Sequence, residues 1–118
     1  MKQHVIVESF SYEHGSPPNA ALTFDCRRMR NPHVIATLKP LTGKDEAVRA
    51  FVKTDPQCKP MIDGVVHSVL LARDFGIAVR VAFGCYGGRH RSVAMAELSA
   101  KALRDAGCDV DVRHSALS

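Results

Sequence analysis

Apolar and polar residues follow one another along this chain in patterns that predict four short strands. Residues 4–11 alternate with a period of two, which is typical of a strand with one buried face. Residues 21–26 and 109–113 are also rich in strand-forming residues. The run 77–83 is the most apolar of the four, and we therefore expect it at the centre of the sheet.

Three other segments repeat their apolar residues every three to four positions, which predicts helices. The first is short and covers residues 45–53. The second covers 59–75 and has Gly76 at its end, where glycine is favoured as a cap. The third covers 90–106. Because this last helix lies between two predicted strands, it implies a parallel pair of strands joined by a right-handed crossover.

These elements predict one α/β domain over residues 1–118, with a small mixed sheet of about four strands flanked by helices. A length of 118 residues and an apolar fraction of 46% suit a single globular domain. The irregular stretch 27–44 is rich in arginine at its start. A loop of this length inside a small domain is usually functional.

Composition excludes several classes of protein. No segment is long and apolar enough to span a bilayer, and the N-terminus lacks the apolar region of a signal peptide. We therefore expect a cytoplasmic protein without a membrane partner. The four cysteines are widely and irregularly spaced, so we expect free thiols and neither a metal nor another cofactor. The net charge of +4 is only a mild basic bias.

The junction between the apolar run 77–83 and the third helix is the most informative segment. Gly84, Gly87 and Gly88 let backbone N–H groups approach an anion closely. Cationic side chains follow at the expected start of the helix, where positive charge opposes the helix dipole unless an anion is bound. The sequence therefore predicts an oxyanion pocket suited to a phosphate group. A Walker A motif is absent, which excludes ATP hydrolysis by that route.

A catalytic interpretation of the same segment stays open. Five residues separate Cys85 from Arg91, and Ser92 follows. This spacing resembles the phosphate-binding loop of cysteine-dependent phosphatases, in which a thiolate attacks phosphorus. Such an enzyme also needs a general acid, for which Asp25 and Asp45 are the candidates. The structural alternative is a small buried cysteine at the end of a strand.

An RNA-binding interpretation rests on the remaining cations. Arg27, Arg28 and Arg30 form a cluster, and Arg113 lies near the end of the chain. If the fold brings these arginines to the cations of the glycine-rich turn, the protein has one basic face that suits RNA phosphates. Otherwise they are separate solvated patches.

Five motifs together resemble a known family. Residues 84–93 resemble the signature Gly-Cys-Thr-Gly-Gly-Lys-His-Arg-Ser-Val of the C-terminal domain of the RNase adapter protein RapZ. Residues 9–15 are similar to that family's Ser-Phe-Gly-Phe-Lys-Tyr-Gly. The other matching stretches, in the same order, are Phe24-Asp25-Cys26-Arg27 with Asn31-Pro32-His33, Leu38-Lys39-Pro40-Leu41-Thr42-Gly43, and Val112-Arg113-His114.

The resemblance implies a function. RapZ-like proteins join a P-loop ATPase domain to this C-terminal domain, which is expected to sense glucosamine 6-phosphate, to contribute to RNA binding and to self-associate. We therefore expect a non-catalytic sensor of a phosphorylated small metabolite, either a sugar phosphate or a nucleotide, that relays to RNA or to a protein partner. The pocket and the resemblance together predict these ligand-binding residues: His33, Cys85, Tyr86, Gly87, Gly88, Arg89, His90, Arg91 and Ser92.

Several positions depart from the family pattern. Tyr86 replaces a threonine of the signature, which predicts an altered ligand preference. Arg28 and Arg30 replace apolar residues and add charge near the pocket. The basic tail of the family is not found in Ser115–Ser118, so we expect weaker contact with RNA phosphates. The chain starts at the C-terminal domain, so we expect any ATPase function to reside in a separate chain.

Overall fold

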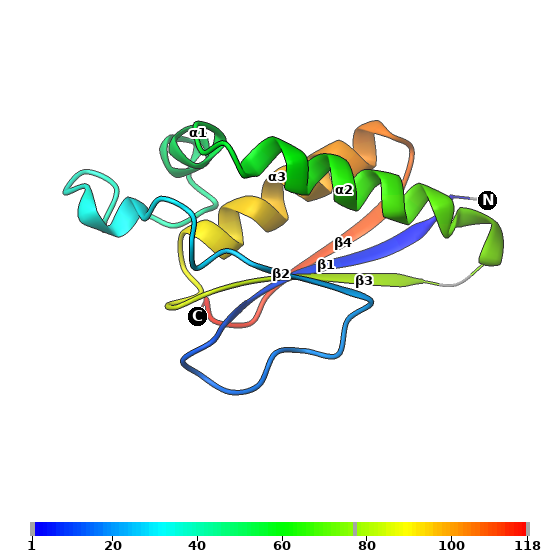
Figure 1. Cartoon of the computed structure of the whole chain (residues 1–118), viewed down its shortest axis with the longest axis horizontal. Helices are drawn as coiled ribbons and strands as arrows, with labels where there is room; N and C mark the ends of the chain where they lie inside the picture. Colours follow the sequence, from blue (N-terminus) through cyan, green and yellow to red (C-terminus); the bar gives the residue numbers. More distant parts are fainter. Residues whose placement is uncertain (1, 77, 118) are drawn as a thin grey trace.

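The fold is built on a four-stranded sheet. The computed structural model describes residues 2–76 and 78–117, and within these ranges three α-helices cover one face of a four-stranded sheet (Figure 1). The strands are β1 (His4–Ser11), β2 (Leu22–Asp25), β3 (Val79–Cys85) and β4 (Asp109–His114). Their order across the sheet is β2-β3-β1-β4, so the apolar strand β3 is central, as predicted.

The predicted four-stranded α/β architecture is confirmed, but the expectation of a mixed sheet is wrong. Each neighbouring pair of strands is parallel. The physical reason lies in the connection between β1 and β2. The loop 12–21 is too long for a tight hairpin, and it runs back along the sheet so that β2 enters in the same direction as β1 (Figure 1).

The helices agree with the predicted segments, with small differences at their ends. They are α1 (Glu46–Lys53), α2 (Cys58–Leu71) and α3 (Arg91–Asp105). The end of α2 is earlier than predicted because the chain tightens into a 3₁₀ turn, η2 (Arg73–Phe75), before Gly76 takes a left-handed conformation. None of the helices in the described ranges is long and apolar enough to cross a membrane.

The start of the predicted third strand at Ile77 lies outside the described residues. Within the described residues β3 begins at Val79 and continues beyond the predicted end at Phe83 to Cys85. This extension matters for the site, because it makes Cys85 the last residue of the central strand rather than part of the following turn.

The core lies between the sheet and α3. Val5 and Val7 of β1 and Val81 and Phe83 of β3 project toward the helices and are fully buried, as the alternation of a strand requires. Residues 91–100 of α3 are almost all buried because the sheet packs on one side of the helix and α1 and α2 pack on the other. All four strands run parallel, so their carboxyl ends and the loops that follow them meet at one edge of the sheet.

Candidate functional site

Residues 86–90 connect β3 to α3 at this carboxyl edge. Gly88 has a φ of +67°, and a Cβ atom there would lie 2.6 Å from the Cβ of Ala116 and 3.0 Å from that of Ser11. Both the backbone conformation and the space therefore require glycine at this position. Gly87 differs, because a Cβ atom on it would meet no protein atom within 4 Å.

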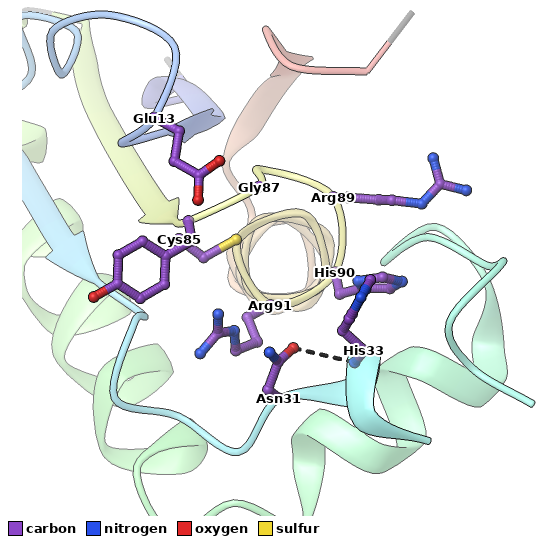
Figure 2. A pocket seen from close by; sticks show the side chains of 9 residues that line it. Glu13, Asn31, His33, Cys85, Gly87, Arg89, His90 and Arg91 are labelled. Carbon is purple, nitrogen blue, oxygen red and sulfur yellow. Dashed lines mark hydrogen bonds between the residues drawn. The ribbon is translucent and has the colours of Figure 1, made fainter. Parts of the chain in front are cut away.

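A cavity of about 360 Å³ opens at the N-terminal end of α3 (Figure 2). This volume is within the range of small-molecule sites. The turn, the end of β3, the start of α3 and two loops distant in sequence contribute its lining residues, which are Glu13, Asn31, His33, Cys85, Tyr86, Gly87, Arg89, His90 and Arg91. A second hollow, of about 390 Å³, shares Gly87 and Arg89 with this cavity.

Most residues of the predicted ligand set meet at this cavity. All of them line it except Gly88, which packs against Ala116, and Ser92, which is fully buried behind Cys85. Sequence reasoning missed two lining residues, Glu13 and Asn31. Asn31 stands in the Asn31-Pro32-His33 motif and Glu13 in the motif 9–15, so their places in these motifs were a usable signal for both.

The turn exposes a row of unused backbone donors. Among the described residues, the N–H groups of Tyr86, Gly87, Gly88, Arg89 and His90 donate to no acceptor. The helix that follows has no side-chain N-cap and no acidic residue in its first turn. The positive end of its dipole and these free donors therefore adjoin the cavity without a capping or acidic side chain from the helix itself, which is the arrangement that favours an anionic group.

Arg91 serves the architecture as well as the cavity. Its side chain is only 5% exposed, and its Nη1 donates to the carbonyl oxygens of Arg27 at 2.8 Å and Met29 at 3.1 Å. This pair of bonds joins α3 to the turn after β2. Among the described residues, Nε and Nη2 of Arg91 have no acceptor, so those donors are available to a ligand.

Arg89 is directed away from the cavity (Figure 2). Its Nε donates to the carbonyl oxygen of Leu41 at 3.0 Å and its Nη2 to that of Pro40 at 2.7 Å. In return the N–H of Gly43 donates to the carbonyl oxygen of Arg89 at 3.0 Å. The side chain of Arg89 thus holds the segment 38–43 against the turn, and its charge acts on the cavity from a distance.

Two histidines form the opposite wall. His90 is buried, and its Nε2 lies 3.2 Å from the carbonyl oxygen of Lys39. Burial lowers the pKa of His90, and the charge of Arg89 adds to the effect. His33 is exposed, with its ring 6.1 Å from that of His90. The side chain of Asn31 accepts a hydrogen bond from the backbone N–H of His33 at 3.1 Å and so fixes this loop (Figure 2).

Cys85 lies at the base of the cavity and is 2% exposed. Its thiol donates to the Oγ of Ser92 at 3.1 Å. The two carboxylates considered as a general acid have other partners and do not line the cavity. Asp25 binds the guanidinium of Arg27 at 2.7 Å, and Asp45 accepts from the backbone N–H of Thr42 at 2.8 Å.

The remaining arginines of the prediction lie at the two edges of the sheet. Arg27 stacks over the ring of Tyr12 at 3.7 Å and, together with Arg28 and Arg30, occupies the turn after β2. Arg113 lies on β4, at the other edge of the sheet, with β3 and β1 in between. The turn after β2 therefore adjoins the cavity through Arg91, whereas Arg113 lies on the strand at the other edge.

Comparisons with known proteins identify the family of this chain. The sequence model of the family described as RapZ C-terminal domain matches residues 3–118. A protein from Cereibacter sphaeroides named nucleotide-binding protein is 40% identical over 118 residues, which are 96% of this chain and 39% of that protein.

Two further relatives carry the same name. One, from Ruegeria pomeroyi, is 46% identical over 115 residues, covering 93% of this chain and 40% of its own length. The other, from Thermobifida fusca, is 43% identical over 113 residues, covering 92% of this chain and 38% of its own length. The chain thus spans about 40% of the length of these relatives.

Proposed function

The chain belongs to the RapZ C-terminal domain family, and on this premise we propose that it is a binding module for a phosphorylated small metabolite. The observation that carries the proposal is the row of unused N–H groups from Tyr86 to His90 beside the cavity. Successive amides at the start of a helix bind phosphate oxygens with little rearrangement, because the donors and the dipole are already in place.

Each part of the cavity has a role in this proposal. The amides of Gly87 and its neighbours hold the phosphate oxygens, and the free Nε and Nη2 of Arg91 neutralise part of the charge. His33 donates a hydrogen bond from the other side. A volume of about 360 Å³ leaves room for a sugar beside the phosphate.

The ligand class follows from family and shape together. A sugar phosphate, with glucosamine 6-phosphate as the first candidate, fits the expectation from the family motifs. A nucleotide is the second candidate, because relatives carry the name nucleotide-binding protein. Tyr86 is 52% exposed at the edge of the cavity and offers an aromatic face to a sugar or a base.

Binding also offers a route for a signal. Arg91 joins the cavity to the turn that carries Arg27, Arg28 and Arg30. A phosphate that recruits the free donors of Arg91 changes the interactions of this shared side chain. In this proposal the turn after β2 relays occupancy of the cavity to RNA or to a protein partner.

The first test is thermal unfolding of the protein with phosphorylated sugars, nucleotides and inorganic phosphate. A compound that binds only the folded state raises Tm by mass action. We expect a selective rise with a sugar phosphate, and we expect Gly87→Ala to abolish it. A methyl group at position 87 meets no protein atom within 4 Å, and Gly87 lines the cavity, so we expect the substitution to crowd the ligand without disturbing the fold.

Gly64→Ala is the matched control, because a Cβ atom on Gly64 of α2 also meets no protein atom and is remote from the cavity. We expect the Gly64→Ala protein to keep the full ligand-induced rise. If no phosphorylated compound raises Tm of the wild type, the cavity is not a phosphate site. If the wild type instead releases inorganic phosphate from one of the phosphorylated compounds, and the Cys85→Ser protein does not, the cysteine-phosphatase alternative is established.

A further inference from the structure

Glu13 places a negative charge at a cavity otherwise suited to anions. It lines the cavity, and its carboxylate points toward the space above the start of α3 (Figure 2). Among the described residues the carboxylate has no hydrogen-bonding or ionic partner. Arg91 and Asn31 lie across the cavity from it (Figure 2). The carboxylate is therefore free to interact with whatever enters.

The position of Glu13 relative to the turn is fixed by the backbone. The Oγ of Ser11 accepts a hydrogen bond from the N–H of Glu13 at 3.1 Å and donates to the carbonyl oxygen of Tyr86. One residue earlier, the N–H of Tyr12 donates to the carbonyl oxygen of Cys85 at 3.0 Å. These contacts tie the start of the loop 12–21 to two consecutive residues at the end of β3, Cys85 and Tyr86, so the backbone of Glu13 is held beside the turn.

A carboxylate at this position restricts which charged and hydrogen-bonding groups the ligand can carry. At pH 7 a glutamate side chain carries a negative charge and only accepts hydrogen bonds. It repels a bare phosphate ion at short range, because both charges are negative. It attracts a ligand that carries an ammonium or hydroxyl group some distance from its phosphate. The cavity thus offers donors at the turn and an acceptor at Glu13.

We propose that Glu13 forms a second subsite, which binds a hydrogen-bond-donating group of the phosphorylated ligand and favours an ammonium group over a hydroxyl group there. The ligands selected in this way are zwitterionic, with a phosphate at the amides and a cation at Glu13. This inference rests on the proposed function, since it assigns the phosphate to the turn.

The test compares three probes: inorganic phosphate, glucose 6-phosphate and glucosamine 6-phosphate. The two sugars differ only at one substituent, which is a hydroxyl in the first and a protonated amine in the second. Calorimetric titration at pH 7 gives the affinity of each probe for the wild type, for Glu13→Gln and for Glu46→Gln. Glu46 is an exposed carboxylate on α1, does not line the cavity, and serves as the matched control.

We expect the wild type and Glu46→Gln to bind glucosamine 6-phosphate roughly tenfold more tightly than glucose 6-phosphate, the usual size of one charge-assisted hydrogen bond. In Glu13→Gln this preference should disappear, while the affinity for inorganic phosphate should rise because a repelling charge is removed. A merely structural role of Glu13 would not raise one affinity and lower another.

An unchanged preference in Glu13→Gln, or equal binding of both sugars by the wild type, would overturn the second subsite while leaving the phosphate site in place. Failure of all three probes to bind the wild type would overturn the proposed function itself. The two failures are therefore distinguishable in one experiment.

Discussion

At the scale of single residues, the arginines of the signature contribute differently from the expectation based on the helix dipole. Arg89 and Arg91 both donate to backbone carbonyl oxygens, of residues 40 and 41 in one case and 27 and 29 in the other. Their first role is to hold two loops around the start of α3. The attraction of the cavity for an anion then depends on the backbone amides at least as much as on guanidinium charge.

His90 makes the stability of the fold depend on pH. Burial lowers the pKa of His90 in the folded protein, whereas in the unfolded chain histidine titrates near its ordinary value of about 6.5. Below that value the unfolded state binds a proton that the folded state binds less readily. The contribution of neutral His90 to the free energy of unfolding is therefore complete above about pH 6.5. It is lost as the pH falls toward the lowered pKa of the folded protein.

The measurement is urea unfolding of the wild type and of His90→Gln at pH 7.5 and 5.5. Glutamine keeps a donor for the carbonyl oxygen of Lys39 but does not titrate. We expect the wild type to lose more free energy of unfolding between these pH values than the variant, because the other histidines contribute equally to both proteins. Equal losses would show that His90 does not titrate differently on folding.

Most of the site residues predicted from the sequence are neighbours along the chain, whereas Glu13, which was missed, comes from a distant loop. Gly87, Gly88 and Arg91 stand in a continuous strand-to-helix segment, so their proximity follows from local geometry. Glu13 reaches the cavity only because Ser11 links its N–H to the carbonyl oxygen of Tyr86. No periodicity or spacing marks such a contact between residues far apart in sequence.

At the scale of elements, the segment 38–43 is the part of the site that tolerates least change. Gly43 packs directly on the first turn of α3. A Cβ atom at this position would contact the amide nitrogen of Ala94 and would lie 2.6 Å from the carbonyl oxygen of His90. Both neighbours are backbone atoms, so they cannot turn aside. The loop must instead move away from the helix.

We therefore expect Gly43→Ala to destabilise the fold by about 1–3 kcal/mol, the usual cost of overpacking. It should also weaken ligand-induced stabilisation, because the displaced loop carries the carbonyl oxygens that hold Arg89 and His90. Urea unfolding and thermal shift measure the two effects. A Gly43→Ala protein as stable as the wild type would contradict the packing argument. Gly64→Ala is the control for the thermal shift alone, because alanine inside helix α2 is expected to raise stability by itself.

The elements themselves were largely predictable because each carries a local signal. The alternation of residues 4–11 and the helical spacing of residues 90–106 gave β1 and α3 nearly their observed bounds. The direction of β2 was not predictable, because it depends on how the loop 12–21 crosses the sheet. Nothing in the residues of that loop distinguishes a return in parallel from a return in the opposite direction.

At the scale of the whole molecule, the arginines considered for RNA binding lie at opposite edges of the sheet. Arg28 and Arg30 lie in the turn after β2, and Arg30 contacts Thr54 and the ring of Phe51 on the same side. Arg113 lies on β4 at the opposite edge, beside Asp111 at 3.3 Å. A nucleic acid that follows the turn after β2 and the cavity would therefore not need Arg113.

The RNA-binding hypothesis can therefore be tested by comparing variants at the two edges of the sheet. If the turn after β2 contacts RNA phosphates, the double variant Arg28→Gln, Arg30→Gln should bind single-stranded RNA more weakly. The slope of log K against log[salt] should become shallower by roughly 0.7 for each RNA phosphate that no longer pairs with an arginine. Arg113→Gln removes the same kind of charge from the other edge, and it should leave both the affinity and the slope unchanged.

Fluorescence anisotropy at several salt concentrations measures the affinity and the slope for each protein. Equal weakening in the two proteins would mean that net charge, rather than the turn beside the cavity, attracts the RNA.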